Sequence, residues 1–592
     1  MLGIRPLLKL LGNSQSSRNS SVLITRALST SAILSKSDDK SLQQIKLDLD
    51  KVSKDENSLK KPKDQTDLAK YELPDNNPEI PKKHVFQRIT TTRLSESFYT
   101  LEQAAQYAPP MTVEKYYKYP ALASNLGQYN YALRSYENEN SVILQFPDVT
   151  DLLIVGGGLV GSATAYYAKF IAGRVADVCV IDKDPCSSHT CTAISNGLIS
   201  SQSLNEEVVR MAQLSKELIR ALRTDILCTK EDFAKINYRP VTHLVLFREA
   251  QVEEALNAVT MQIKNHGYVE AKLPDQLETT FPFLRVQGSD VALGTHGNQD
   301  EALVDPIALR SLYRTLAQAH GASFIKAEAL DFNMVHSRSS RNIGVLGASA
   351  MVARIDNGEL KNVFFGHTLL CSGHDTPYLE AQAEMEDYQR DALEDMHFMQ
   401  PKMRLMFTFS SADTPVINFP VITDTDGSQL ICQDFAGTFK YYANMEESEK
   451  MFEEDSGKFV DFDSKEPYPC LFHRDKKMEI YFNNVVKPKL VNRIPVMDDA
   501  KFLFAQTGFE NWNINDGSPV LAEHPYFLTI AMAGGFGNRM LNFAPMAGLA
   551  FAEITCLDDL KTLDIKSFDW DRVFKNVRIK EFPQILGGFE QF

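Results

Sequence analysis

The stretch that decides the fold is Asp151–Asp184, which reads DLLIVGGGLVGSATAYYAKFIAGRVADVCVIDKD. Leu152–Val155 is a short apolar run, as expected of a strand buried on both faces. Ala163–Phe170 has helical character, Gly173 ends this helix, and Val178–Ile181 reads as a second buried strand. This order predicts a β-α-β unit of a Rossmann-like α/β fold.

Glycines at three positions of the turn after the first strand fit the pattern GxGxxG: Gly156, Gly158 and Gly161. The first permits a tight turn, the second lets the backbone approach a pyrophosphate, and the third lets the helix pack close to the strand. The helix N-terminus offers unpaired N–H groups and a partial positive charge to phosphates. Asp182, at the end of the second strand, can accept hydrogen bonds from a ribose hydroxyl.

A bare GxGxxG also occurs in Gly-rich turns of unrelated α/β proteins. Here the strand, the helix, the second strand and the terminal acid follow in register, which predicts a site for an adenine dinucleotide. An acid at Asp182 disfavours a 2′-phosphate, so NAD and FAD remain as candidates and NADP is disfavoured.

Length, charge and cysteine usage narrow the class of protein. The 592 residues are enough for two or three structural units. A formal net charge of −15 argues against nucleic-acid binding, which requires a basic surface. The eight cysteines form no CxxC pair and no Cys/His cluster with zinc spacing, so we expect no metal site and a reducing compartment. No run approaches about 20 uninterrupted apolar residues, so we expect no transmembrane helix; a peripheral association with the inner mitochondrial membrane stays open.

The first residues have the composition of a mitochondrial transit peptide. Met1–Lys36 contains five basic and no acidic residues, is rich in Ser, and can place several leucines on one side of a helix. We therefore expect a transit peptide over 1–36 and a location in the mitochondrial matrix or on the matrix face of the inner membrane. Residues 37–84 read as a charged, flexible linker and 85–146 as an N-terminal extension without a motif.

Segments farther along the chain favour FAD over NAD. A Ser/Thr/Gly-rich loop follows the acid strand at Ser187–Leu198, another buried strand runs into glycine at His367–Gly373, and a glycine-containing stretch opens an apolar segment at Ala531–Glu553. This order resembles the D-amino-acid oxidase superfamily, which includes sarcosine oxidase and dimethylglycine dehydrogenase. The likeness extends from about Asp151 to Ile585 and is carried by DLLIVGGGLVG, PDQLETTFPFL at Pro274–Leu284, LVDP at Leu303–Pro306, WNINDGSPVLAEHP at Trp512–Pro525 and GGF…AP at Gly534–Pro545.

The resemblance implies a Rossmann-like FAD-binding domain that is split in sequence, with an inserted substrate domain built on an antiparallel sheet. We place the FAD-binding domain at 147–203, 302–378 and 504–560. The substrate domain then covers 204–301 and 379–503, and 561–592 form a C-terminal tail.

The resemblance also implies contacts with the cofactor, position by position. The three glycines of the first turn and Gly373 would approach the pyrophosphate, and Asp182 would bind the ribose. The loop Thr192–Gly197 and the segment Gly535–Leu541 would face the flavin. The implied cofactor contacts are Gly156, Gly158, Gly161, Asp182, Thr192, Ser195, Gly373, Gly535, Phe536, Gly537 and Asn538.

The chain departs from the family pattern at several of these positions. Asn538 and Met540 stand where relatives usually have glycines that bring backbone amides to the flavin, and a positive φ would be costly for Met. In some relatives a His or Cys is bonded covalently to FAD. Here the family's linking His falls nearest Ile194, His189 is not aligned with it, and no matching Cys lies near the C-terminal segment, so we expect non-covalent FAD.

Relatives bind a small carboxylate-bearing amine over the flavin with Arg or Lys. Arg suits a carboxylate because its planar fork can donate two parallel hydrogen bonds. Arg539 in the flavin-facing segment is a candidate clamp or a structural Arg; Arg404, which alternates with Lys402 on an expected strand, faces either the cavity or solvent. His374 is a candidate acid or base, although a lone His after a strand is more often structural.

Three function classes remain open. The first is an FAD-dependent oxidoreductase that acts on a small amine or amino acid. The second is a flavin-binding assembly factor for respiratory complex I with little or no turnover, implied by the likeness to a mitochondrial member of the family. The third is an NAD-dependent dehydrogenase. Expected partners are accordingly a small amine substrate or complex I subunits and assembly factors.

Overall fold

The computed structural model places the chain in two compact units, Met1–Arg88 and Ile89–Phe592, and all described residues belong to the second. The structure describes residues 147–590 except 174–175, 186–189, 298–300, 337–345, 356–357, 374–375, 377–398, 457–471, 474–475, 525–528 and 558. The predicted transit peptide (1–36), linker (37–84) and N-terminal extension (85–146) lie outside the described residues, as does His374.

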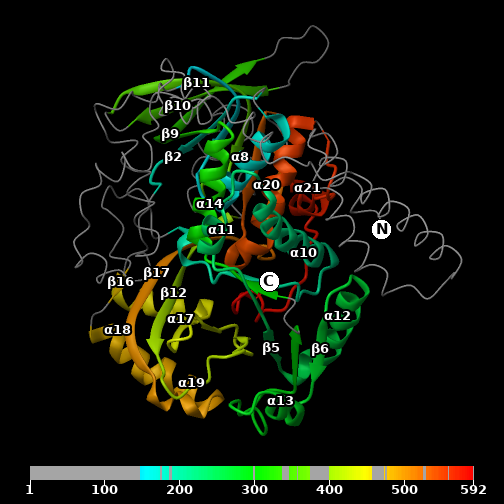
Figure 1. The fold of residues 1–592 in the computed structure, drawn as a ribbon, viewed down its shortest axis with the longest axis vertical. Helices are drawn as coiled ribbons and strands as arrows, with labels where there is room; N and C mark the ends of the chain where they lie inside the picture. The colour runs from blue at the N-terminus through cyan, green and yellow to red at the C-terminus, as the bar shows by residue number, and fades with distance from the viewer. Residues whose placement is uncertain are drawn as a thin grey trace, which may run out of the picture. The chain divides into compact units, whose positions relative to one another are not determined.

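A seven-stranded sheet forms the core of one of the two halves of the fold (Figure 1). Its central strand β1 (Val149–Val155) pairs in parallel with β2 (Val178–Asp182) and with β11 (Leu360–Leu370). The sheet continues through β19 (Ile530–Gly534) to β18 (Val520–Glu523), while β2 pairs in parallel with β9 (Ser323–His336). The parallel core and its buried apolar strands confirm the predicted α/β class.

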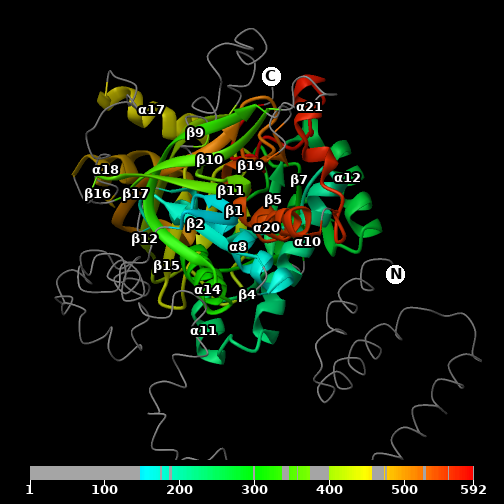
Figure 2. The same ribbon diagram turned by 90° about the horizontal axis from the view of Figure 1, so that it is seen from above.

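The long strand β11 pairs with different strands along its two halves. The first half of β11 pairs antiparallel with β10 (Leu346–Ile355), and β10 pairs antiparallel with β9. The second half of β11 pairs in parallel with β1. Figure 2 shows the resulting order, with β9 and β10 on one side of β1 and β2 and with α8 (Leu159–Ala172) on the other.

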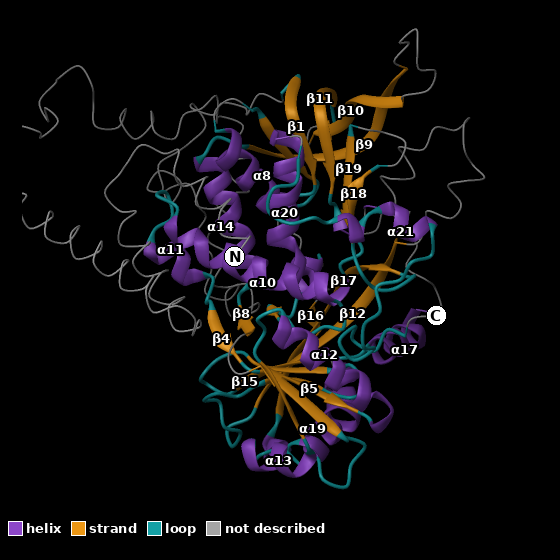
Figure 3. Cartoon of the chain, turned by 90° about the vertical axis from the view of Figure 1, so that its right-hand side faces the viewer, coloured by secondary structure: helices purple, strands orange, loops and turns teal. Residues whose placement is uncertain are grey.

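Helices cover one face of this sheet (Figure 3). They are α8, α14 (Pro306–Ala319) and α20 (Met540–Leu557), and α10 (Glu206–Ala221) packs on α20. A Cβ on Gly548 of α20 would come within 2.7 Å of the Cβ of Ala163, so α20 and α8 pack closely because this residue is glycine. The stretch Gly537–Leu557 is long and apolar enough to cross a membrane, but 78% of its apolar 18-residue window is buried inside the fold, as in the core helix of a globular domain.

A nine-stranded sheet forms the core of the other half of the fold, in the order β16-β17-β12-β15-β14-β13-β5-β7-β6. Its strand pairs are antiparallel except β13 with β5, which are parallel. The strands are β5 (His243–Phe247), β6 (Val269–Lys272), β7 (Leu293–Gly297), β12 (Met399–Ser410), β13 (Val421–Thr423), β14 (Gln429–Cys432), β15 (Thr438–Tyr442), β16 (Phe472–His473) and β17 (Lys501–Asn513).

The two faces of β12 have different neighbours. Leu405, Phe407 and Phe409 lie in an apolar core with Phe482 of η6 (Phe482–Val486). Met406 instead packs with residues of the small sheet β3-β8-β4, formed by Leu198–Ile199, Glu301–Leu303 and Arg239–Val241. Because successive side chains of a strand alternate between faces, Arg404 and Met406 point to this same side of the nine-stranded sheet.

The structure differs from the predicted segments at two places, the start of β17 and the C-terminal segment. β17 starts at Lys501 and pairs along its length with β12, although the third FAD-binding segment was placed from 504 onward. The described residues of the predicted C-terminal tail (561–592) contribute Phe568, Trp570, Phe582 and Leu586 to buried clusters. Apart from the short helices η9 (Lys566–Phe568) and α21 (Trp570–Phe574), the described part of this segment is irregular, and its apolar residues are divided among several clusters.

Candidate active site

The first turn is held by two glycines whose neighbours are backbone atoms. Gly156 has φ +106°, and a Cβ there would lie 2.5 Å from the carbonyl oxygen of Cys371. A Cβ on Gly161 would lie 2.0 Å from the carbonyl oxygen of Gly156. These two positions therefore bring β1, the end of β11 and α8 into contact that no larger residue allows.

Gly158 differs from these two glycines because it faces open space. A Cβ there would meet only the Thr192 Oγ1 atom, at 3.6 Å. The helix α8 that follows has no side-chain cap and no acidic residue in its first turn. The N–H of Leu159 donates to Thr192 Oγ1 at 3.3 Å. A helix N-terminus with its partial positive charge and room beside it fits a phosphate group.

Asp182 lies beside this turn, at the end of β2. A Cβ on Gly157 would come within 2.5 Å of the Asp182 Oδ2 atom, so the carboxyl faces the glycine turn. Desolvation by the surrounding chain raises the pKa of Asp182 to about 6, and the positive charge of Arg314 opposes this shift. The carboxyl is therefore placed to accept hydrogen bonds from a ribose at the edge of the turn.

The predicted flavin-facing loop connects both halves of the fold. Thr192 lies in α9 (Cys191–Ile194), and its hydroxyl is 3.8 Å from the Met540 sulfur at the start of α20. The carbonyl oxygen of Ser195 accepts a hydrogen bond of 3.1 Å from the Tyr442 hydroxyl of the nine-stranded sheet. Gly373 has φ +66° and its carbonyl oxygen accepts from the Asn511 side chain at 2.7 Å. These contacts bring together the loop after β2, the start of α20, Gly373 and the strands β15 and β17; we call this region, where we expect the dinucleotide, the crevice.

The C-terminal glycines Gly535 and Gly537 have positive φ angles and pack on β17. A Cβ on Gly535 would lie 3.1 Å from the Asn513 side chain, and one on Gly537 would lie 3.0 Å from the Trp512 ring. Phe536 is buried between them and forms a β-bridge with Trp512. Close packing on Asn513 for Gly535, and on Trp512 for Gly537, accounts for both glycines without reference to a flavin.

Neither Asn538 nor Met540 has a positive φ, so the strain expected at Met540 is not present. Within the described part of the chain, the non-glycine residues with positive φ are Asn237, His266, Asn418 and Asn576. Met540 has φ −50° and ψ −39°, because η8 (Gly537–Arg539) leads directly into α20. The side chains at these two positions therefore carry no backbone penalty.

Arg404 is the buried cation of the crevice. Its side chain is 1% exposed, its Nη1 atom lies 3.3 Å from Glu510 Oε2, and its guanidinium lies over the Tyr442 ring. Trp512 Nε1 donates to the same Glu510 oxygen at 3.1 Å. Burial raises the pKa of Glu510, while Arg404 opposes the shift. Arg404 thus faces the inside of the fold, which resolves the alternative left open by its sequence pattern.

Arg539 has structural partners. It lies 3.5 Å from Glu581, donates to the Ser518 hydroxyl at 3.2 Å and lies over the Phe543 ring. Burial lowers the pKa of Arg539, and Glu581 opposes this. These contacts tie η8 to the C-terminal segment, so they favour the structural alternative for Arg539.

Several buried polar atoms of the crevice have no hydrogen-bond partner among the described residues. These atoms are Arg404 Nε and Nη2, Asn511 Oδ1, Asn538 Oδ1 and Arg539 Nε; Arg539 Nη1 also has no hydrogen bond but lies 3.5 Å from Glu581. Leaving a buried polar group unpaired costs about 1–3 kcal/mol, so a cluster of unpaired groups indicates a polar ligand. Together with the space beside Gly158, this set of donors and acceptors fits a dinucleotide with a small polar molecule at its far end.

Sequence reasoning missed the contribution of β17. Glu510, Asn511 and Asn513 are all buried, in a strand whose neighbours along the chain are also buried. Polar residues in a fully buried strand are unusual, and this was the available signal. Their pairing with Arg404 and Gly373 could not be read from one chain without the register of β12 and β17.

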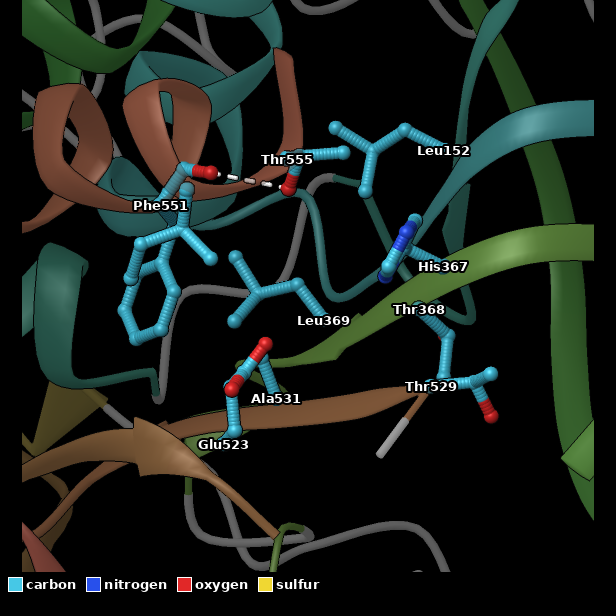
Figure 4. Close-up of a pocket in the computed structure, with 10 residues that line it drawn as sticks. Leu152, His367, Thr368, Leu369, Glu523, Thr529, Ala531, Phe551 and Thr555 are labelled. Atoms are coloured by element: carbon cyan, nitrogen blue, oxygen red, sulfur yellow. Dashed lines mark hydrogen bonds between the residues drawn. The ribbon is translucent and has the colours of Figure 1, made fainter. Parts of the chain in front are cut away.

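A small hollow lies away from this crevice (Figure 4). It is lined by residues of β1, β11 and α20, including Leu152, His367 and Phe551, and it has about 10 Å³ of room for the centre of a water molecule. Such a space holds about one water. Among the described residues, no three His, Cys, Asp or Glu side chains form a group that could hold a metal ion.

The model of the DAO family, described as FAD dependent oxidoreductase, matches residues 151–554. The chain belongs to this family. The match confirms the predicted superfamily, and it makes FAD the cofactor indicated for the crevice. The match starts at the first residue of the stretch that reads as a β-α-β unit and ends inside α20.

Relatives support the same assignment. The chain is 24% identical over 463 residues to the FAD-dependent oxidoreductase domain-containing protein 1 homolog of Drosophila melanogaster, covering 76% of this chain and 84% of that protein. It is 25% identical over 446 residues to FAD-dependent oxidoreductase domain-containing protein 1 of Xenopus laevis, covering 74% of this chain and 85% of that protein.

Solved structures share the DAO fold. The L-proline dehydrogenase from P. horikoshii aligns with a TM-score of 0.56 at 16% identity, over 74% of this chain and 100% of that one. The glycine oxidase from Geobacillus kaustophilus aligns with a TM-score of 0.52 at 17% identity, over 71% and 98%. At this identity the likeness confirms the fold alone.

Proposed function

We propose that this chain is a mitochondrial oxidoreductase that holds FAD non-covalently and oxidises the C–N bond of a small amine that bears a carboxylate. The DAO family membership supports the reaction class. The single observation that carries the substrate class is the free edge of the Arg404 guanidinium.

The two unpartnered nitrogens of Arg404, Nε and Nη2, form one edge of its guanidinium. The N–H groups along this edge are parallel, so they fit the two oxygens of a carboxylate. The opposite nitrogen, Nη1, is held by Glu510. Arg404 is therefore fixed on one side and available on the other, as a clamp for a substrate carboxylate requires.

The residues that would hold FAD follow from the crevice. The space beside Gly158 and the N-terminus of α8 would take the pyrophosphate, and Asp182 would accept a hydrogen bond from the ribose. The loop at Thr192 and Ser195 and the segment at Asn538 would lie toward the flavin end. When bound, FAD supplies the acceptor for a hydride from the carbon next to nitrogen.

Glu510 affects the charge next to the substrate site. The groups that interact electrostatically with it are Arg404, Tyr442 and Cys191, and burial raises the pKa of the Cys191 thiol to about 12. Within this cluster, burial therefore favours the protonated form of Glu510 relative to a carboxyl group in water. A protonated Glu510 leaves Arg404 with a net positive charge, which attracts a carboxylate.

Non-covalent FAD is supported by the position that relatives use for the bond. The family's linking His falls nearest Ile194, an apolar side chain that is 1% exposed and cannot form such a bond. The mitochondrial location is supported by the acid-free, Arg- and Ser-rich first 36 residues. Import of the full chain into isolated mitochondria, with and without residues 1–36, tests the location.

The proposed reaction is tested with purified, FAD-loaded chain in the absence of oxygen. Small amino acids and N-methyl amino acids are added one at a time, each beside the matching amine without its carboxylate. We expect at least one carboxylate-bearing amine to bleach the flavin band faster than its matched amine. If FAD is bound and no amine in either set bleaches it, the proposed turnover is wrong.

A second function, assembly of respiratory complex I with little turnover, is favoured by one observation. Gly587 lies next to the side chains of both Arg404 and Asn538, and Asn538 donates to the Ile585 carbonyl oxygen, so the chain's own C-terminal turn fills space beside Arg404. Cells lacking this chain are complemented with the wild type or with Arg404→Gln. Equal recovery of complex I by both would support an assembly role without turnover, and failure of Arg404→Gln would support the oxidoreductase.

A further inference from the structure

The C-terminal turn of the chain lies against the proposed carboxylate clamp. Gly587 has φ +65°, and a Cβ there would lie 3.0 Å from Arg404 Nη1 and 3.2 Å from Asn538 Nδ2. The Asn538 amide donates to the carbonyl oxygen of Ile585 at 3.1 Å. The turn therefore occupies space between the nine-stranded sheet and the flavin-facing segment.

Contacts on both sides hold this turn in place. The N–H of Met445 donates to the Gly587 carbonyl oxygen at 3.0 Å. Leu586 is fully buried beside Trp512, and the Phe589 ring lies 5.1 Å from the Trp512 ring. Trp512 in turn donates to Glu510, the partner of Arg404. A buried turn with this many partners is a fixed wall and not a fraying end.

We propose that Ile585, Leu586 and Gly587 form one wall of the substrate site beside Arg404 and limit the site to substrates with a short side chain. This inference rests on the proposed function, because it takes Arg404 as the carboxylate clamp. Glycine at 587 is then required for two reasons: the positive φ, and the lack of room for a methyl group next to the guanidinium.

Gly588 supplies a matched control. It also has a positive φ, +88°, but a Cβ there would meet the Asp426 carbonyl oxygen at 2.9 Å and the Asn444 Cβ at 3.2 Å. The variants Gly587→Ala and Gly588→Ala therefore carry similar backbone strain in the same turn. Only the first directs its methyl group at Arg404.

The test uses the FAD-loaded full chain and the straight-chain carboxylates from acetate to hexanoate. Binding is followed by calorimetry and by the visible spectrum of the flavin. For the wild type we expect the affinity to fall by about 10-fold or more from propionate to hexanoate. We expect Gly587→Ala to weaken propionate binding by about 10-fold, while Gly588→Ala stays within about 2-fold of the wild type.

Two results would overturn the wall. One is that hexanoate binds the wild type more tightly than propionate, a result that needs no variant to fold. The other is that both glycine variants, each shown to retain FAD, change propionate affinity equally. Arg404→Gln separates this inference from the proposed function. Loss of propionate binding in Arg404→Gln with no effect of Gly587→Ala removes the wall alone, whereas equal binding by Arg404→Gln and the wild type removes the clamp and the wall together.

Discussion

The two ends of the crevice are built in different ways. At the nucleotide end, Gly156 and Gly161 lie against backbone atoms of β11 and of the turn itself, so the geometry is fixed by main chain on main chain. At the substrate end, Arg404, Glu510 and Trp512 form a buried polar cluster between two strands and the C-terminal turn. The first end tolerates almost no change in shape, whereas the second can change its binding properties while the fold remains.

The largest expected effect is at Gly161. Gly161→Ala would place a methyl group 2.0 Å from the Gly156 carbonyl oxygen, and neither α8 nor β1 can move without opening the core. We expect the free energy of unfolding to fall by about 3 kcal/mol or more, with loss of bound flavin. Thermal denaturation of the variant measures this. Wild-type stability in Gly161→Ala would show that main-chain contact does not define the nucleotide end.

The substrate end is tested by Arg404→Gln. Two hydrogen bonds from a charged group to a carboxylate are lost, so we expect substrate or propionate affinity to fall by about 100-fold, or about 3 kcal/mol. FAD binding should be retained. The control is Lys402→Gln on the same strand, because Lys402 Nζ pairs with Glu449 at 2.9 Å near the surface. A similar loss in both variants would remove Arg404 from the site.

Gly158→Ala sharpens the comparison within the nucleotide end. Its methyl group has no clash inside the chain, since only Thr192 Oγ1 lies near it, at 3.6 Å. We expect unchanged stability of the FAD-free protein, but an FAD affinity lower by about 10-fold, because the methyl group faces the expected pyrophosphate. Fluorescence titration with FAD measures the affinity. If Gly158→Ala instead unfolds the protein and Gly161→Ala does not, the assignment of the two glycines is reversed.

The smallest effect is a pH dependence from Asp182, whose pKa in the free protein is raised to about 6. A ribose hydroxyl that donates to the carboxyl favours its charged form. FAD affinity should therefore be full above pH 6 and decrease as the pH falls through about 6, by up to about 10-fold at pH 5. The measurement is FAD affinity from pH 5 to 7.5, and Asp182→Asn should show no such decrease. A decrease of the same size in that variant would assign it to another group.

Sequence alone could predict the nucleotide end because its signals lie within one short stretch. Strand, glycine turn, helix and terminal acid occur in order between Asp151 and Asp182, and each has a local physical reason. The fold class followed from the same pattern. The predictions for Thr192, Ser195 and Gly373 came from the family resemblance, and the structure places these three residues around the same crevice.

The substrate end could not be predicted because it is assembled from distant positions. Arg404 and Glu510 meet only through the pairing of β12 with β17, and Gly587 reaches them from a segment without periodicity. The absence of strain at Met540 could not be predicted from the sequence either, since the φ angle of Met540 depends on where η8 passes into α20. Long-range register and irregular packing decide such features, and neither leaves a local pattern.

The central claim is that the crevice at the glycine turn holds one FAD without a covalent bond. It is tested most directly by incubating the purified chain with FAD, removing free flavin, and measuring the flavin released by acid precipitation of the protein. The account predicts about one FAD per chain, all of it in the supernatant. A chain that retains no flavin, or flavin that stays with the precipitated protein, would contradict it.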